Sequence, residues 1–158
     1  MEELDDTHWQ DMIDVNLTGV WHAAKAAIPH LRAAGGGSMI LTSSTAGLMA
    51  IPNIGHYTAA KHGVVGIART MANELAQHKI RVNTVHPTGV NTPMAEGLGG
   101  LNPLIERDPN LGPIFVNALP VEAVEARDIS NAVLFLASDE AQYVTGLEFT
   151  VDAGNTIR

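Results

Sequence analysis

The chain has 158 residues, 46% hydrophobic and 16% charged, which predicts one folded domain over residues 1–158 rather than a disordered segment. A net charge of −8 without a Lys/Arg cluster argues against a nucleic-acid partner, and the lack of cysteine excludes disulfides and thiolate metal sites. An acidic N-terminus without a leader pattern, and no apolar stretch near the ~20 residues that span a bilayer, predict a cytoplasmic protein that does not enter a membrane.

The first predicted element is a helix over residues 7–33. Thr7 and Gln10 have the spacing of a capping box at its start, and the glycines within 33–37 stop it. Its apolar residues cover more than one face, which indicates burial on several sides or a subunit interface. These residues are Trp9, Met12, Ile13, Val15, Leu17, Val20 and Trp21.

Strands and helices alternate along the rest of the chain. The pattern predicts a strand at 38–44, a helix at 56–78, a strand at 80–87, a helix at 125–138 and a strand within 146–154. Helices alternating with strands indicate an α/β fold with a parallel sheet. An initial helix and three strands match part of a Rossmann-type, doubly wound sheet that lacks its N-terminal βαβ nucleotide-binding half.

Residues 88–123 form a long connection rich in glycine and proline. A connection of this length in a compact domain is usually a lid or a binding loop, so residues 93–123 are predicted to be a substrate-binding lid. Its apolar residues favour a hydrophobic small molecule, terpenoid-like or steroid-like. They are Leu98, Leu101, Leu104, Ile105, Leu111, Ile114 and Phe115.

Tyr57 and Lys61 are four residues apart in the predicted helix 56–78, so their side chains share one face. A free phenol has a pKa near 10, and a nearby ammonium lowers such a pKa by roughly 1–3 units, which makes the pair a candidate general acid/base. Ser44 ends a predicted parallel strand, at the edge where ligands collect, and its hydroxyl can hydrogen-bond the same substrate oxygen. Tyr-x-x-x-Lys alone occurs by chance in many helices, so the prediction depends on the combination.

Five short stretches form an ordered pattern around these residues. They are VNLTG (15–19), ILTSSTAG (40–47), YTAAK (57–61), IRVNTVHPTGVNTPM (80–94) and YVTGLEFTVDAG (143–154). In this order they resemble the short-chain dehydrogenase/reductase family over nearly the whole chain. Thr88 stands where the family usually has a glycine after Pro87, and this segment is most similar to the carveol dehydrogenase-like, mycofactocin-associated subgroup.

The resemblance implies an NAD(P)-dependent oxidoreductase that interconverts a hydrophobic alcohol and its ketone or aldehyde. Tyr57 would exchange a proton with the substrate oxygen, Ser44 would hold that oxygen, and Lys61 would lower the phenol pKa and bind the nicotinamide ribose. Asn16 would hold a water of the proton relay. The remaining residues that would contact the cofactor are Pro87, Thr88, Gly89, Val90 and Thr92. NAD is the expected cofactor through the subgroup, with NADP as the alternative.

The sequence lacks the family's front section, including its Gly-rich phosphate-binding turn. GGGS (35–38) follows a helix and precedes a strand, which is the reverse of a phosphate-binding turn, and GLGG (97–100) has no third glycine at Asn102. One alternative is therefore a truncated, non-catalytic member that acts as an oligomerising or interaction module. Another is that the missing half is a separate chain, or that the gene start is mis-assigned.

The resemblance also implies a homo-oligomer. In this family, the helices that correspond to 7–33 and 56–78 usually build a dimer interface, and their broad apolar surfaces agree with self-association. Strand 38–44 would then expose an unpaired sheet edge. The seven histidines show no metal-ligand spacing, and His56 and His86 are the two that could border the active site.

Overall fold

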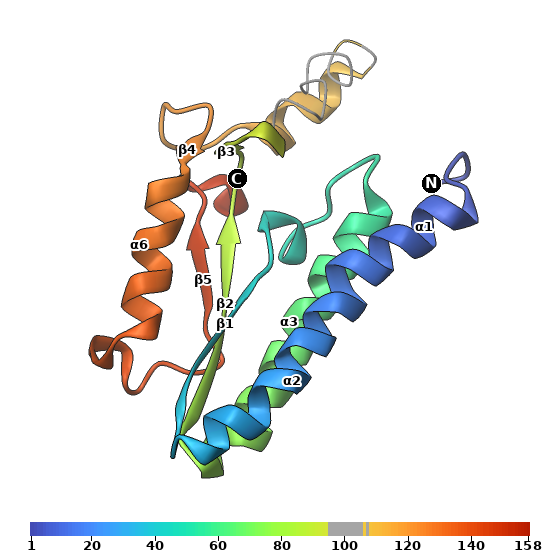
Figure 1. The fold of residues 1–158 in the computed structure, drawn as a ribbon. Helices are drawn as coiled ribbons and strands as arrows, with labels where there is room; N and C mark the ends of the chain where they lie inside the picture. The colour runs from blue at the N-terminus through green and yellow to red at the C-terminus, as the bar shows by residue number, and fades with distance from the viewer. Residues whose placement is uncertain (95–105, 107) are drawn as a thin grey trace.

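The structure, a computed structural model, describes residues 1–94, 106 and 108–158. It confirms the predicted α/β fold with a parallel sheet (Figure 1). Three strands form this sheet in the order β1–β2–β5. Their bounds are Gly37–Thr42 for β1, Ile80–Pro87 for β2 and Glu148–Val151 for β5. Because the strands are parallel, their carboxyl ends lie at one edge, which is where ligands bind in sheets of this kind.

The register of the strands determines which residues lie level with one another at that edge. β1 pairs with β2 from Gly37 opposite Ile80 to Thr42 opposite Val85. The pairing continues one residue beyond β1, because the Ser43 N–H donates to the Val85 carbonyl at 2.9 Å. The loop that follows β1 therefore starts from the sheet edge with its backbone already fixed.

Helices cover both faces of the sheet (Figure 1). They are α1 (Asp6–Ile13), α2 (Gly19–Ala33), α3 (Gly55–Leu75) and α6 (Ala126–Ala137). α2 and α3 lie on one face and α6 lies on the other. The main core lies between α2, α3 and the sheet, and the three-and-four spacing of apolar residues along α3 explains why this helix packs there. The buried side chains of this core are Ala24, Met39, Leu41, Val64, Ala68, Met71, Ala72, Leu75, Ile80 and Val82.

The first helix differs from the prediction of one continuous helix over 7–33. A π-helical turn, Asp14–Thr18, separates α1 from α2. The helix is capped by Asp5, whose carboxylate accepts the His8 N–H at 2.9 Å, so the predicted capping box at Thr7 is wrong. An aspartate at the N-cap satisfies a free N–H of the first turn and suits the positive end of the helix dipole.

The two tryptophans, Trp9 and Trp21, are not part of the core of this chain, because each is 38% exposed. Val15, on the same stretch, is 72% exposed. The expectation that the whole first helix is buried on several sides is therefore wrong for this chain. The other alternative that the sequence indicates for these side chains is a subunit interface.

The described part of the long connection after β2 contains one short strand pair and one 3-10 helix. β3 (Val90–Asn91) and β4 (Val124–Glu125) pair in parallel, and η4 (Pro109–Phe115) is a 3-10 helix between them. Some of the predicted lid residues lie outside the described part of the chain, namely Leu98, Leu101, Leu104 and Ile105, as does the GLGG stretch. Within the described ranges, no helix combines the length and the apolar character needed to cross a lipid bilayer.

Candidate active site

Ser44 lies just beyond the carboxyl end of β1, which ends at Thr42 rather than at Ser44 as predicted. The chain turns here into the short 3-10 helix η2 (Thr45–Gly47). The Ser44 hydroxyl accepts a hydrogen bond from the Ala46 N–H at 3.2 Å, and its carbonyl accepts one from the Gly47 N–H at 2.9 Å. The turn therefore holds both the side chain and the peptide group of Ser44 at the ligand-binding edge of the sheet.

Tyr57 and Lys61 lie on one face of α3, as their spacing predicts. The Lys61 ammonium lies 5.4 Å from the centre of the Tyr57 ring and donates a hydrogen bond to the Thr42 carbonyl at 3.2 Å. Lys61 is only 7% exposed, which is unusual for a lysine. Within the described part of the chain it has no second hydrogen-bond acceptor, so two of the three N–H groups of an ammonium stay available.

The phenol and the amine are both shifted towards their neutral forms. Burial raises the pKa of Tyr57, and hydrogen bonding by the Ser44 side chain opposes this by lowering it. Burial also lowers the pKa of Lys61. The net shift of the Tyr57 pKa is upward, because the cost of burying a phenolate outweighs the effect of the Ser44 side chain. That Lys61 lowers this pKa stays a prediction.

Ser44 thus lies close enough to Tyr57 to affect its pKa, and Lys61 lies over the tyrosine ring from the same helix. The three side chains come from two segments, the loop after β1 and the first turns of α3, that meet at the carboxyl edge of the sheet. The structure thus brings together the three residues on which the sequence prediction depends.

Asn16 occupies the π-helical turn, Asp14–Thr18, between α1 and α2. Its amide donates to the Met12 carbonyl at 3.3 Å, so the side chain folds back along its own helix. The turn packs closely against α3, because a methyl group added at Gly63 would lie 2.7 Å from the Leu17 side chain. π-helical turns are rare, and those that do occur are often found at functional sites. This one contacts α3, the helix that carries Tyr57.

The segment after β2 lies at the same edge of the sheet. Its predicted cofactor-binding residues are Pro87, Thr88, Gly89, Val90 and Thr92. The Thr88 hydroxyl donates to the side-chain oxygen of Asn117 at 3.1 Å, and the Thr92 hydroxyl donates to the Val90 carbonyl at 3.3 Å. The Thr88 hydroxyl thus ties the segment to the loop before β4, whereas the Thr92 hydroxyl bonds within the segment.

Two polar residues hold the site together, Ser43, which sequence reasoning missed, and His86, whose contact it did not identify. The Ser43 hydroxyl donates to the Lys61 carbonyl at 3.1 Å. His86 lies with its Nδ1 atom 2.7 Å from the Ser44 carbonyl oxygen, whereas the sequence indicated only that it could border the site. The available signal for His86 was its position in a strand predicted to be buried, where a polar side chain needs a hydrogen-bond partner.

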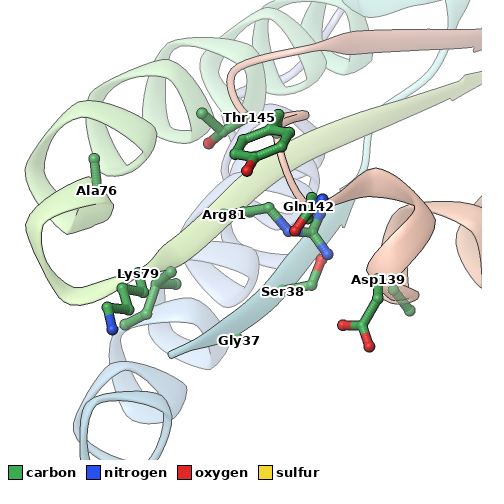
Figure 2. Close-up of a pocket in the computed structure, with 11 residues that line it drawn as sticks. Gly37, Ser38, Ala76, Lys79, Arg81, Asp139, Gln142 and Thr145 are labelled. Atoms are coloured by element: carbon green, nitrogen blue, oxygen red, sulfur yellow. The ribbon is translucent and has the colours of Figure 1, made fainter. Parts of the chain in front are cut away.

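A cavity of about 500 Å³ lies at the opposite, amino end of β1 and β2, away from Ser44 (Figure 2). Arg81 and Ser38 line it, but both are engaged with the C-terminal end of α6. Arg81 donates to the carbonyls of Leu136 and Ser138 at 2.8 and 3.1 Å, and Ser38 also donates to Leu136. The described residues contain no group of three or more His, Asp or Glu side chains placed to hold a metal ion.

Comparison with known proteins fits this arrangement. The profile of a family described as enoyl-(acyl carrier protein) reductase matches residues 1–156. The solved structure of a short chain dehydrogenase from Mycobacterium paratuberculosis, bound to NAD, superimposes with a TM-score of 0.95 at 41% identity, over 99% of this chain and 59% of that one. The chain belongs to the short-chain dehydrogenase/reductase family.

The resemblance to the carveol dehydrogenase subgroup is also confirmed. This short-chain dehydrogenase/reductase is 51% identical over 165 residues to the (-)-trans-carveol dehydrogenase of Rhodococcus erythropolis, which covers 99% of this chain and 59% of the relative. The structure of carveol dehydrogenase from Mycobacterium avium in complex with NAD has a TM-score of 0.89 and 48% identity, over 100% of this chain and 60% of that one. The chain thus spans about three-fifths of the length of these relatives.

Proposed function

We propose that this protein takes part in the NAD(P)-dependent interconversion of an alcohol and a ketone or aldehyde. The observation that carries the proposal is the meeting of Ser44, Tyr57 and Lys61 at the carboxyl edge of the sheet. A phenol, a hydroxyl and a buried amine at one point suit proton exchange with a single substrate oxygen.

The proposed roles follow from the hydrogen-bonding capacity of each group. In carbonyl reduction, the Tyr57 hydroxyl gives a proton to the substrate oxygen while the Ser44 hydroxyl donates a hydrogen bond to the same atom. In alcohol oxidation, Tyr57 must first be ionised in order to accept the proton. Because burial raises the pKa of Tyr57, reduction is expected to need no prior ionisation at neutral pH, and oxidation is expected to accelerate as the pH rises.

The surroundings of Lys61 fit a nicotinamide cofactor. Two ammonium N–H groups that have no acceptor in the described part of the chain can bind the ribose hydroxyls, and the buried position of the amine gives such bonds added strength. When bound, the nicotinamide supplies the hydride chemistry. We propose NAD rather than NADP because two similar solved structures are complexes with NAD.

We further propose that Asn16 extends the proton path by holding a water beside Lys61, and that residues 87–92 lie along the cofactor. The π-helical turn around Asn16 packs on α3, which supports the first role. The position of Pro87 at the end of the central strand supports the second.

The substrate is proposed to be a small hydrophobic alcohol or ketone. A cavity of about 520 Å³ lies between the loop after Ser44 and the described part of the proposed lid, residues 93–123. Its lining is almost entirely apolar, apart from one arginine. The lining residues are Met49, Gly112, Pro113, Ile114, Val116 and Arg158. A cavity of this size and character suits a compact cyclic alcohol of the kind named for the carveol dehydrogenase relatives.

Titration of the purified chain with NADH, followed by nicotinamide fluorescence, tests the proposal. The expected result is saturable binding together with alcohol-dependent formation of NADH from NAD. Tyr57→Phe is the matched variant, because it should retain binding and lose turnover. Lys61→Met should weaken binding itself. Equal turnover by Tyr57→Phe and the unsubstituted chain would refute the role of the phenol.

A second candidate function is that of an oligomerising module without catalytic activity. It is favoured by the exposed apolar side chains of Trp9, Val15 and Trp21. In this candidate function, the chain forms a homo-oligomer whose interface consists of the helices within 7–33 and 56–78. Sedimentation analysis should then give a mass above that of the monomer, and Val15→Glu should return it to the monomer. Absence of cofactor binding at millimolar NADH, together with self-association, would favour this candidate.

A further inference from the structure

We propose that His86 is a positioning residue that fixes the peptide group of Ser44, and so the direction of the Ser44 hydroxyl, from the central strand of the sheet. This inference rests on the proposed function of Ser44. The loop after β1 must hold the Ser44 hydroxyl close to the Tyr57 phenol if both are to reach one substrate oxygen. His86 would not contact substrate or cofactor, and would act only through Ser44.

The contacts of His86 define which nitrogen carries its proton. The side chain is fully buried, at 0% exposure. Its Nδ1 atom lies 2.7 Å from the Ser44 carbonyl oxygen, and its Nε2 atom lies 2.7 Å from the Thr84 hydroxyl. A carbonyl oxygen can only accept, so Nδ1 must carry a hydrogen and donate. In the neutral ring Nε2 is then an acceptor, and the Thr84 hydroxyl donates to it.

The bond to Ser44 does not depend on the charge of the ring. The Thr84 hydroxyl also lies 3.4 Å from the Leu147 carbonyl, so it can donate there when Nε2 is itself protonated. Nδ1 donates to Ser44 in both cases. Burial lowers the pKa of His86 and favours the neutral ring, while Glu148 and Asp152 oppose that shift and His62 adds to it.

The bond matters because it comes from outside the loop. The backbone N–H groups that donate to Ser44 are those of Ala46 and Gly47, which belong to the same turn and would move with it. His86 is on β2, which is paired with β1 on one side and with β5 on the other. Through His86, the peptide group of Ser44 is tied to the most constrained strand of the sheet. Without His86, the Ser44 carbonyl would keep only the Gly47 N–H, a donor of the same turn, so the turn could shift as a unit.

Two substitutions separate the two ends of the imidazole. His86→Asn places an amide N–H close to the position of Nδ1, so it can retain the bond to Ser44. His86→Gln places its amide close to the position of Nε2, so it retains the contact with Thr84 and loses the bond to Ser44. Both variants replace the ring by a polar amide, so they serve as controls for each other.

NMR spectroscopy tests the bond without any need for turnover. Ser44 and Thr45 form the one Ser–Thr pair in the sequence, so labelling with [13C-carbonyl]serine and [15N]threonine isolates the Ser44 carbonyl signal. The expected result is an upfield shift of that signal in His86→Gln and little change in His86→Asn. The ring nitrogens of the unsubstituted protein should show the Nδ1–H form, a measurement that needs no variant to fold. An Nε2–H form, or equal carbonyl shifts in the two variants, would overturn the proposal.

Kinetics then test the consequence for catalysis. His86→Gln is expected to lower kcat/KM for the alcohol by about tenfold or more, since small displacements of a catalytic group cost factors of this order, while the KM for NAD stays unchanged. His86→Asn should recover most of the loss. Equal losses in both variants would mean a purely structural role and would overturn the proposal. If the unsubstituted chain shows no turnover, the proposed function fails, and the NMR result still decides whether His86 anchors Ser44.

Discussion

The hydroxyl of Ser43 donates a hydrogen bond of 3.1 Å to the backbone carbonyl of Lys61. Ser43 is 3% exposed, so this bond is shielded from water. It joins the residue after β1 to the second turn of α3, the helix that carries Tyr57 and Lys61. The distance between the loop that presents Ser44 and the helix that presents the phenol is therefore set by a side chain that takes no part in the chemistry.

Removing this hydroxyl should loosen the junction. Ser43→Ala removes a second donor from the Lys61 carbonyl, which keeps its bond within α3, and the loss of one such hydrogen bond costs roughly 0.5–1.5 kcal/mol. We expect a lower midpoint in urea unfolding and weaker binding of NADH. Ser130→Ala is the control, because Ser130 lies exposed on α6 and bonds only to its own helix at Ala126. Equal effects of the two substitutions would contradict the role of Ser43.

The same junction leaves no room for a side chain at Gly47. A methyl group added there would collide with the Ser43 hydroxyl and lie 2.9 Å from the Lys61 carbonyl oxygen. Gly47→Ala should therefore destabilise the fold by about 1–3 kcal/mol, the usual cost of overpacking. Gly66→Ala, on the same helix as Lys61, meets nothing within 4 Å and should stabilise the fold by roughly 0.5–1 kcal/mol through helix propensity. Thermal unfolding followed by circular dichroism measures both changes.

The buried amine of Lys61 should lower stability at neutral pH. Burial lowers its pKa in the folded state below the ordinary value of 10.5, so the unfolded chain binds the proton more tightly. Between the lowered pKa and 10.5 the unfolded state holds more protons, and the Lys61 contribution to stability therefore rises with pH in this window. Below the window the cost of burying the ammonium is constant.

Lys61→Met removes that cost. The variant should be more stable than the unsubstituted chain at neutral pH, and the difference should shrink as the pH rises towards 10.5. Urea unfolding at a series of pH values measures it. A difference that stays constant or grows with pH would be inconsistent with a buried, partly neutralised amine.

Arg81 should be a main source of stability at the opposite end of the sheet. Its guanidinium donates to the carbonyls of Leu136 and Ser138, at the end of α6. Arg81→Met deprives these carbonyls of a charged donor and should cost about 2 kcal/mol or more, without changing the NADH affinity. Arg69→Met is the control, because Arg69 is largely exposed and its ion pair with Glu148 should contribute at most about 1 kcal/mol. A change in NADH affinity with Arg81→Met would contradict the expectation that the amino end of the sheet does not influence cofactor binding at its carboxyl end.

The fold could be predicted to the extent that apolar spacing determines it. β2 was predicted at 80–87 and has the bounds Ile80–Pro87, because an apolar strand bounded by a proline leaves little freedom. The π-helical turn at Asp14–Thr18 could not be predicted, because one extra residue in a helix leaves the composition unchanged. The exposure of Trp9 and Trp21 depends on what packs against the first helix, which the local sequence does not contain.

The candidate site was predictable where residue spacing fixes geometry. The placement of Tyr57 and Lys61 on one face follows from the helical repeat alone. The direction of the Tyr57 pKa shift was not predictable, because it depends on how deeply the phenol is buried. The link from His86 to Ser44 spans 42 residues of sequence, and only the pairing of β1 with β2 brings the two residues together.

The two adjacent serines after β1, Ser43 and Ser44, direct their side chains to opposite sides of the backbone. Side chains of extended residues alternate between the two sides of the backbone, so Ser43 turns towards the Lys61 carbonyl and Ser44 turns towards the phenol. Inserting or deleting a single amino acid between them and the strand would exchange those directions, leaving the Ser44 hydroxyl facing the interior. This stretch should therefore tolerate changes of length far less well than changes of composition.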